Sequence, residues 1–409
     1  MKFLFLTQYY APEVGAAQTR LAAVTKSMRA AGHDVEVVTA LPNYPLGRIF
    51  DGHRHRLLTT SVEDEIRIHR VWLFAALGTG ARRLASYLSF AITSVLGLAR
   101  VRKPDAIVIE SPPLFVAVTG ILYGKLRRIP VVLNVADLWP DAAVALGALS
   151  EGPILNAMLG IERWAYRQSA IVSTVTEGVR ERLIRDKGVA PEHIVMLANG
   201  VDTEQFRPDG GNVDILVKLG LPERDFLVYA GTMGLAHGID PLFDAMKRLP
   251  KSNDGPYLLM LGSGSERTRL IRRAEDEGIG NVEFREPVPL ADLAELLPLA
   301  LIGVVTLAEI PLNDSCRPAK LYPLMSAGLA VLFAGGGEGA EIVSEAQCGV
   351  VVPNRAEEIA AAIEMLCADA ETRKRMAGNA REAVERSWSW DRQTAAWLHA
   401  INDIMKAQA

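Results

Sequence analysis

Short apolar stretches and helical stretches alternate along this chain, and the alternation starts a second time near its middle. KFLFLTQ at 2–8 and VEVVTA at 35–40 are typical of strands, and the segment between them, residues 16–34, has the composition of a helix. The same order returns with DFLVYAG at 225–231 and a helix at 240–249. Strands this short and this apolar, separated by helices, indicate parallel sheets that are covered on both faces.

The length of the chain fits two such sheets, because 409 residues exceed what a single hydrophobic core usually accommodates. Residues 199–212 are rich in Gly, Asp, Asn and Pro and are typical of a linker. We therefore predict an α/β protein with two doubly wound, Rossmann-like domains facing each other across a cleft. The N-terminal domain is predicted at 1–205, with a C-terminal helix at 386–409 crossing back to it, and the C-terminal domain at 206–385. Ligands bind beyond the carboxyl ends of strands in such sheets, so the cleft is the expected site.

The composition narrows the function further. A formal net charge of -4 without an acidic or basic tail argues against a nucleic-acid binder. Cys316, Cys348 and Cys367 are too few for a disulfide framework and suit a reducing cytosol. MKFLFLTQYY is followed by no cleavage site, and no apolar run reaches about 18 residues, so we expect no signal peptide and no membrane span. The expected location is cytoplasmic, with the inner face of the cell membrane as a second location.

Three histidines, His53, His55 and His69, raise the question of a metal site. No Cys or paired carboxylate joins HRHR at ligand spacing. We interpret HRHR as a solvated basic loop and expect no metal.

Glycine-bearing turns follow three of the predicted strands, with Gly15 after the first, Gly231 and Gly234 after the strand at 225–231, and Gly262 and Gly264 after the next. Glycine lets a backbone approach a phosphate closely, and the start of the following helix offers free N–H groups. The alternative is that these are ordinary strand-to-helix turns. No GxGxxG and no GxxxxGK[ST] is present, which disfavours a dinucleotide enzyme and a P-loop NTPase.

RPAKLYPLMSAG, residues 317–328, combines two cations with a predicted helix. We expect Pro318 to be the first helical residue, which places Arg317 and Lys320 at the helix N-terminus. Two cations there oppose the helix dipole unless an anion binds, and a pyrophosphate is the anion that we expect. The alternative is two solvated surface cations. Pro323 falls inside the predicted helix, where it removes a backbone hydrogen bond.

The chain resembles the retaining glycosyltransferases of family 4, which have the two-domain GT-B fold. The resemblance rests on stretches along nearly the whole chain and is greatest to the bacterial O-antigen and capsule branch, including N-acetyl-L-fucosamine transferases. The stretches, in order, are QYYAPEVGAAQTR, GHDVEVVTALPNYPLG, ESPPL, DLWPDAAVALG, NGVDTEQF, YAGTMGLAHGID, LGSGSE, NVEFREPVP, RPAKLYPLMSAG and AGGGEGAEIV.

This resemblance implies a sugar transferase that uses a nucleotide-sugar donor, most simply a UDP-sugar, with no cofactor and no required metal. The acceptor is a glycan or a lipid-linked glycan in cell-surface polysaccharide or lipopolysaccharide synthesis. The implied catalytic residues are Asp137, Arg317 and Lys320. The implied donor-binding residues are Gly15, Gly231, Thr232, Met233, Gly234, His237, Gly262, Gly264, Val288, Arg317, Lys320, Leu321 and Glu338. On the acceptor side we expect Asp137, together with Asn43 and Tyr44 of PNYP, for which a purely structural turn is the alternative.

The sequence departs from the family pattern at several of these positions. Thr232 and His237 stand where the family often has a basic Arg and Lys, so the diphosphate should depend more on Arg317 and Lys320. Ser315 and Pro323 stand where many members carry two glutamates, the second of which grips the ribose. Glu338 and Glu341 are both candidates to replace it. An alternative is therefore a catalytically weakened nucleotide-sugar-binding or assembly protein of the same fold, and a third hypothesis is an epimerase.

For the mechanism, no carboxylate is an evident nucleophile, in contrast to the two-carboxylate scheme of many glycosidases. We expect positive charge to stabilise the departing diphosphate while the acceptor hydroxyl attacks from the same face.

Residues 82–103 form a long apolar segment with cations at both ends, and ILYGKLRR at 121–128 is a second one. Such helices can lie on an anionic membrane. The alternative is a core helix whose terminal cations extend to solvent.

Overall fold

The computed structural model describes residues 1–13, 15–78, 80–145, 149, 152–249 and 255–408. Val14, Leu146 and Gly147, which belong to two of the quoted stretches, lie outside the described residues. The chain forms two compact units, Met1–Ala198 with Trp390–Ala409 and Asn199–Ser389, where the sequence predicts boundaries at 205/206 and 385/386. Residues 199–212 are not an open linker. They belong to the second unit, and Val201 and Phe206 are buried in its core.

The first unit contains an eight-stranded sheet in the order β3-β4-β2-β1-β5-β6-β7-β8. Neighbouring strands are parallel except for β3 and β4, which pair antiparallel. Its strands are β1 (Lys2–Leu6), β2 (Asp34–Ala40), β3 (Leu58–Glu63), β4 (Ile66–Val71), β5 (Ala106–Ser111), β6 (Val131–Val135), β7 (Ile171–Thr174) and β8 (Ile194–Met196). Its helices are α1 (Ala16–Ala30), α2 (Ala81–Leu98), α3 (Phe115–Arg127), α4 (Asp141–Ala145), α5 (Pro153–Gln168), α6 (Glu177–Arg185) and α15 (Trp390–Gln408).

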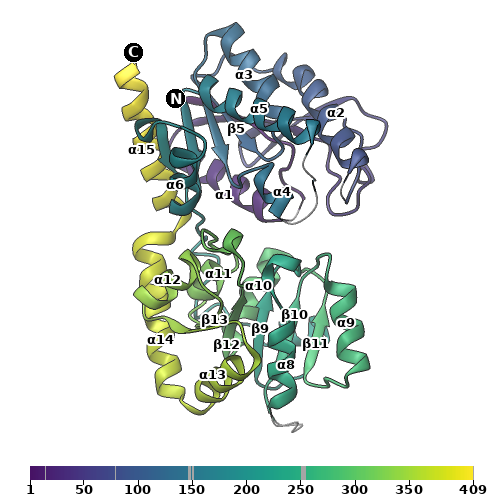
Figure 1. Cartoon of the computed structure of the whole chain (residues 1–409), viewed down its shortest axis with the longest axis vertical. Helices are drawn as coiled ribbons and strands as arrows, with labels where there is room; N and C mark the ends of the chain where they lie inside the picture. Colours follow the sequence, from purple (N-terminus) through teal and green to yellow (C-terminus); the bar gives the residue numbers. More distant parts are fainter. Residues whose placement is uncertain (14, 79, 146–148, 150–151, 250–254, 409) are drawn as a thin grey trace. The chain divides into compact units, whose positions relative to one another are not determined.

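Alternate residues of the strands bury opposite faces of this sheet. Phe3 and Phe5 of β1 pack in a cluster with residues of α1 and α15, whereas Leu4 and Leu6 pack with residues of α2 and α3. The terminal helix α15, yellow in Figure 1, lies against α1. Its Trp397 is fully buried and donates from its indole nitrogen to the Ser173 hydroxyl at 2.9 Å. A sheet buried on both faces explains why its central strands β1, β5 and β6 are mostly apolar at successive positions.

The second unit contains a six-stranded sheet, β11-β10-β9-β12-β13-β14, in which all neighbours are parallel. Its strands are β9 (Phe226–Ala230), β10 (Tyr257–Leu261), β11 (Val282–Arg285), β12 (Ile302–Thr306), β13 (Ala330–Ala334) and β14 (Gly349–Val352). Its helices are α7 (Asp214–Leu219), α8 (Asp240–Arg248), α9 (Arg267–Asp276), α10 (Leu290–Leu296), α11 (Leu321–Ser326), α12 (Glu338–Glu345), α13 (Ala356–Ala368) and α14 (Ala370–Ala383). Figure 1 shows these helices around the sheet, with α9 next to β11 and α14 at the opposite side.

Each unit is thus a Rossmann-like α/β domain, which confirms the predicted fold class. The strand order reverses between β9 and β12 in the second unit and between β1 and β5 in the first. Ligands of open α/β sheets bind outside the carboxyl ends of the strands at such a reversal. None of the helices in the described ranges combines the length and apolar character that crossing a membrane requires.

Candidate functional site

Lys320 lies at the strand-order reversal of the second unit, directly before α11. Its Nζ donates a hydrogen bond to the Tyr229 hydroxyl and lies 3.7 Å from the centre of the Tyr229 ring. Tyr229 is fully buried in β9, and its hydroxyl donates to the Thr232 carbonyl at 2.7 Å. Tyr229 therefore connects the lysine to the loop at 231–234, which the sequence predicts to bind phosphate.

The charge of Lys320 has no carboxylate to balance it among the residues that the structure describes. Its polar partner is the Tyr229 hydroxyl, and none of the described carboxylates pairs with it. Desolvation lowers the pKa of Lys320 to about 7, and the nearby Cys316 opposes this shift. A lysine held by a hydroxyl and an aromatic face is suited to take an anion from solvent.

Three glycines let the neighbouring loops pack closely around this lysine. A Cβ atom on Gly231 would lie 2.8 Å from Lys320 Cε. A Cβ on Gly262 would lie 2.1 Å from the Gly231 carbonyl oxygen, and one on Gly264 would lie 2.2 Å from the Met233 carbonyl oxygen. The loops are joined by hydrogen bonds from Gly231 N to Leu261 O at 2.9 Å and from Met233 N to Ser263 O at 2.8 Å. Gly262 and Gly264 thus have a packing role, and donor contact by them stays a prediction.

His237 lies at the end of a short turn, Leu235–His237, that follows Gly234. Its ring packs edge-on against Tyr229, with 6.4 Å between ring centres. Burial lowers the pKa of His237 to about 3, and the positive charge of Lys320 adds to this shift. His237 is therefore neutral at physiological pH. It supplies no cation in place of the lysine that the family often carries here.

Arg317 differs from Lys320 because a carboxylate already neutralises it. Arg317 Nε donates to Glu338 Oε2 at 2.6 Å, and both side chains are mostly buried. The guanidinium also lies over the Trp388 ring, 5.5 Å from its centre. Glu338 is the first residue of α12, where the helix dipole favours a negative charge. The pair gives Glu338 a structural role beside the ribose contact predicted for it.

The helix α11 begins three residues later than the sequence predicts. It starts at Leu321, so Pro318 precedes it, and the N–H of Leu321 donates to the Pro318 carbonyl at 3.0 Å. Pro323 is the third helical residue, in the first turn, where backbone N–H groups lack intrahelical acceptors. The expected loss of a hydrogen bond at Pro323 is therefore wrong, because none is available there to lose.

Two further predicted donor residues lie outside this cluster of side chains. Val288 lies between β11 and α10 and is half-buried against the core of the second unit. Gly15 belongs to the first unit, where it caps α1 and accepts a hydrogen bond from the N–H of Thr19 at 2.9 Å. Their contact with a donor stays a prediction.

The predicted acceptor residues Asn43 and Tyr44 are held by one buried carboxylate. Glu13 Oε1 accepts from the N–H of Asn43 at 2.7 Å, from its side-chain amide at 3.1 Å and from the N–H of Tyr44 at 2.8 Å. Burial raises the pKa of Glu13, and these hydrogen bonds oppose the shift. The Tyr44 ring packs edge-on against Tyr9, with 6.2 Å between ring centres. Glu13 was not predicted, although a carboxylate so soon after a strand end is a usable signal.

A cluster of buried polar side chains near the predicted catalytic Asp137 was also not predicted. Arg20 of α1 forms an ion pair with Glu110 at the end of β5, and Glu110 accepts from the Asn134 amide of β6 at 2.7 Å. Asp137 follows β6 and reaches the surface. Desolvation of its carboxyl raises the pKa of Asp137, and the charge of Arg20 opposes this shift. Charged residues inside an amphipathic helix and an apolar strand are the sequence signal for this group.

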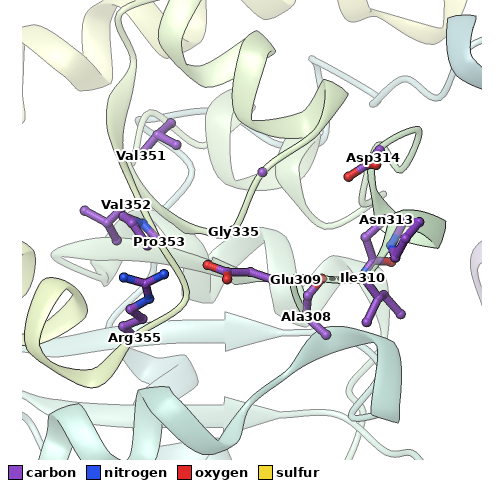
Figure 2. A pocket seen from close by; sticks show the side chains of 12 residues that line it. Ala308, Glu309, Ile310, Asn313, Asp314, Gly335, Val351, Val352, Pro353 and Arg355 are labelled. Carbon is purple, nitrogen blue, oxygen red and sulfur yellow. Dashed lines mark hydrogen bonds between the residues drawn. The ribbon is translucent and has the colours of Figure 1, made fainter.

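A pocket of about 630 Å³ lies beside the Lys320 cluster, at the carboxyl ends of β12, β13 and β14. Its polar lining consists of Glu309, Asn313, Asp314 and Arg355, and Figure 2 shows Arg355 and Asp314 on opposite sides. Asn313 donates to the Ala236 carbonyl at 2.8 Å, which links the pocket to the turn that holds His237. None of the predicted site residues lines it.

In the part of the chain that the structure describes, no group of three His, Cys, Asp or Glu side chains is placed to hold a metal ion.

Two family models match this chain. Residues 15–200 match the glycosyl transferase 4-like domain, and residues 214–383 match the glycosyl transferases group 1. The chain is 28% identical to the putative colanic acid biosynthesis glycosyl transferase WcaI of Escherichia coli K12 over an alignment of 343 residues. The alignment covers 80% of this chain and 82% of that protein.

Solved structures share the fold. The sucrose-phosphate synthase of Thermosynechococcus elongatus aligns with a TM-score of 0.75 and 18% identity over 100% of both chains. HepE of Anabaena, solved in complex with UDP-glucose, aligns with a TM-score of 0.73 and 17% identity over 98% of this chain and 100% of that chain.

Proposed function

The chain is a glycosyltransferase with the GT-B fold, made of a glycosyl transferase 4-like domain and a group 1 domain, and we propose that it moves a sugar from a UDP-sugar to a glycan acceptor in cell-surface polysaccharide synthesis. The observation that carries this proposal is the environment of Lys320. Its ammonium lies at the strand-order reversal of the donor-type domain, beside a glycine that leaves room for it, and no described carboxylate neutralises it.

The donor diphosphate binds at Lys320 in this proposal, with Arg317 as the second cation. When the bond between the sugar and the diphosphate breaks, negative charge grows on the departing diphosphate. A cation fixed at that place stabilises the transition state more than the ground state. Asp137 faces the acceptor, whose hydroxyl attacks from the same face as the leaving group, so that the anomeric configuration is retained.

The donor sugar is proposed from the sequence resemblance. The motifs are similar to those of N-acetyl-L-fucosamine transferases, which favours a UDP-linked N-acetylamino sugar. The name of the relative WcaI, a putative colanic acid biosynthesis glycosyl transferase, agrees with a role in polysaccharide synthesis.

The acceptor is proposed to be lipid-linked, with the first domain in contact with the inner face of the membrane. Exposed apolar side chains support this proposal. On α2 they are Leu88, Ile92, Val95 and Leu96, and on α3 they are Leu122 and Leu126. The exposed cations Arg100, Arg102 and Lys103, just after the end of α2, suit an anionic lipid surface.

Substitution of the cations tests the proposed donor site. In calorimetry with UDP, Lys320→Ala should weaken binding by about 10-fold to 100-fold, the value of a lost charge-assisted hydrogen bond. Arg317→Ala should have a smaller effect, because Glu338 already neutralises that side chain. Lys374→Ala, which removes an exposed cation of α14, is the matched control. UDP affinity and turnover that remain unchanged in Lys320→Ala would refute the assignment.

A further inference from the structure

The first unit contains a second cation without a described carboxylate partner, Arg83 in the first turn of α2. Its Nη2 donates to the Tyr9 hydroxyl at 2.6 Å, its Nε to the Tyr87 hydroxyl at 2.9 Å and its Nη1 to the Ala76 carbonyl at 2.8 Å. None of its described contacts is with a carboxylate. A guanidinium has five N–H donors, so Nη1 and Nη2 each keep one after these three bonds are made.

Aromatic rings surround this guanidinium. Its Cζ lies 4.9 Å from the centre of the Tyr87 ring and 5.6 Å from that of Tyr9. Tyr44 packs edge-on against Tyr9, and Trp139 packs edge-on against Tyr87 with 6.4 Å between ring centres. The rings hold the side chain in one position at the carboxyl end of the sheet. Neutral partners fix the geometry of Arg83 and leave its charge uncompensated, which favours an anionic ligand.

An exposed apolar strip begins at the same place. Ala76, whose carbonyl accepts from Arg83, lies between Phe74 and Leu77, which are 39% and 44% exposed. A Cβ on Gly47 would lie 2.7 Å from Leu77 Cγ, so Leu77 packs on the loop that carries Asn43 and Tyr44. Large exposed apolar side chains next to a half-buried cation suit a ligand that has a charged group and a hydrocarbon chain.

We propose that Arg83 binds a phosphate group of the acceptor, and that a hydrocarbon chain attached to this phosphate lies over Phe74 and Leu77. The ligand class is a lipid phosphate or diphosphate. This inference rests on the proposed function, in which the acceptor is lipid-linked, and it names the part of the acceptor that the first domain holds. Arginine suits this role because its planar fork offers paired donors to phosphate oxygens.

The test uses farnesyl diphosphate as the probe and calorimetry on the full chain. Saturating UDP is present, so that the anion site at Lys320 is filled. Arg83→Gln should weaken probe binding by about 10-fold or more, as expected for a lost charged hydrogen bond. The matched control is Arg82→Gln, which removes an exposed cation from the adjacent position of the same helix and should bind the probe like the wild type.

Leu77→Ser tests the hydrocarbon part through a side chain that is largely exposed, so the fold should tolerate it. It should weaken farnesyl diphosphate binding and leave inorganic pyrophosphate binding unchanged. Equal probe affinity in Arg83→Gln, Arg82→Gln and the wild type would overturn the inference, as would complete block of the probe by UDP. UDP affinity measured in the same variants separates the donor proposal at Lys320 from the inference at Arg83. If UDP fails to bind the wild type, the donor proposal fails, and the effect of Arg83→Gln on the probe is judged by itself.

Discussion

Lys320 Nζ lies 3.7 Å from the centre of the Tyr229 ring and donates to the Tyr229 hydroxyl, which donates in turn to the Thr232 carbonyl. An ammonium in this position has neutral partners and little water. The free energy of its charged form therefore depends on whether an anion is bound nearby. This relationship predicts that UDP binding at Lys320 depends on pH.

UDP binding should weaken as the pH rises through about 7. The pKa of Lys320 is lowered to about 7 in the ligand-free protein, so the side chain loses its proton above that pH. A bound diphosphate favours the charged form and raises the pKa, so at pH 8 binding should take up about one proton. Calorimetry in two buffers with different ionisation enthalpies measures this uptake.

Lys320→Arg provides the control for this pH dependence. An arginine stays charged at all of these pH values, so the uptake near pH 8 should disappear while UDP still binds. His237 contributes no titration in this range, because its pKa is lowered to about 3. Identical proton uptake in the wild type and in Lys320→Arg would contradict the assignment of the titrating group to Lys320.

Loss of Glu338 should destabilise the second domain. Glu338→Ala leaves Arg317 mostly buried without its carboxylate, and breaking such a pair costs about 3–5 kcal/mol of unfolding free energy. The double variant Arg317→Ala with Glu338→Ala should be less destabilised than the sum of the two single variants, because no unpaired charge remains. Urea unfolding of the four proteins measures this coupling, and simple additivity would show that the pair is not energetically linked.

The sequence predicts interior strands of the two sheets better than strands at the sheet edges. The interior strands β1, β2 and β9 were predicted because they are short, apolar and next to helices. The edge hairpin β3–β4 and the strand β14 were missed. β3 is LTTSVE, with polar side chains on a partly exposed edge, and β14 is a four-residue, half-buried strand. An edge strand needs fewer apolar residues, so its pattern is weaker.

The sequence predicts which residue types form the site, but it does not predict which side chains pair with one another. Arg317 and Lys320 look equivalent in RPAK, yet among the described residues a carboxylate pairs with Arg317 alone, because Glu338 is brought next to it from 21 positions away. The contact between Arg83 and Tyr9 joins residues 74 positions apart. Neither pairing has a local signature, since each depends on how the loops at the sheet edge are folded together.

Gly262 should tolerate no side chain. In Gly262→Ala the new Cβ would lie 2.1 Å from the Gly231 carbonyl oxygen, and the backbone φ of 144° is itself unfavourable for alanine. Separation of the two loops would displace Gly231 from Lys320, so we expect lower thermal stability and weaker UDP binding together. Gly280→Ala is the control, because its Cβ would meet no atom within 4 Å. Wild-type stability in Gly262→Ala would show that the loops do not pack as described.

The exposed apolar face of α2 should bind anionic membranes. Leu88, Ile92 and Val95 follow helical spacing and are 41%, 72% and 54% exposed. A carboxylate at the most exposed of them opposes both apolar insertion and attraction to anionic lipid. Ile92→Asp should therefore reduce binding to phosphatidylglycerol vesicles by about 10-fold, since burying an isoleucine contributes about 1.5–3 kcal/mol. Sedimentation with vesicles measures this binding.

Val217→Asp provides the matched control for this surface. Val217 is 84% exposed on α7 of the second unit, so the substitution makes the same charge change on another exposed helix. Its vesicle binding should equal that of the wild type. An equal loss in both variants would mean that net charge governs the binding, whereas a loss in Ile92→Asp alone assigns it to the α2 surface. Salt should weaken the wild-type interaction without abolishing it, because the apolar part of the contact is not screened.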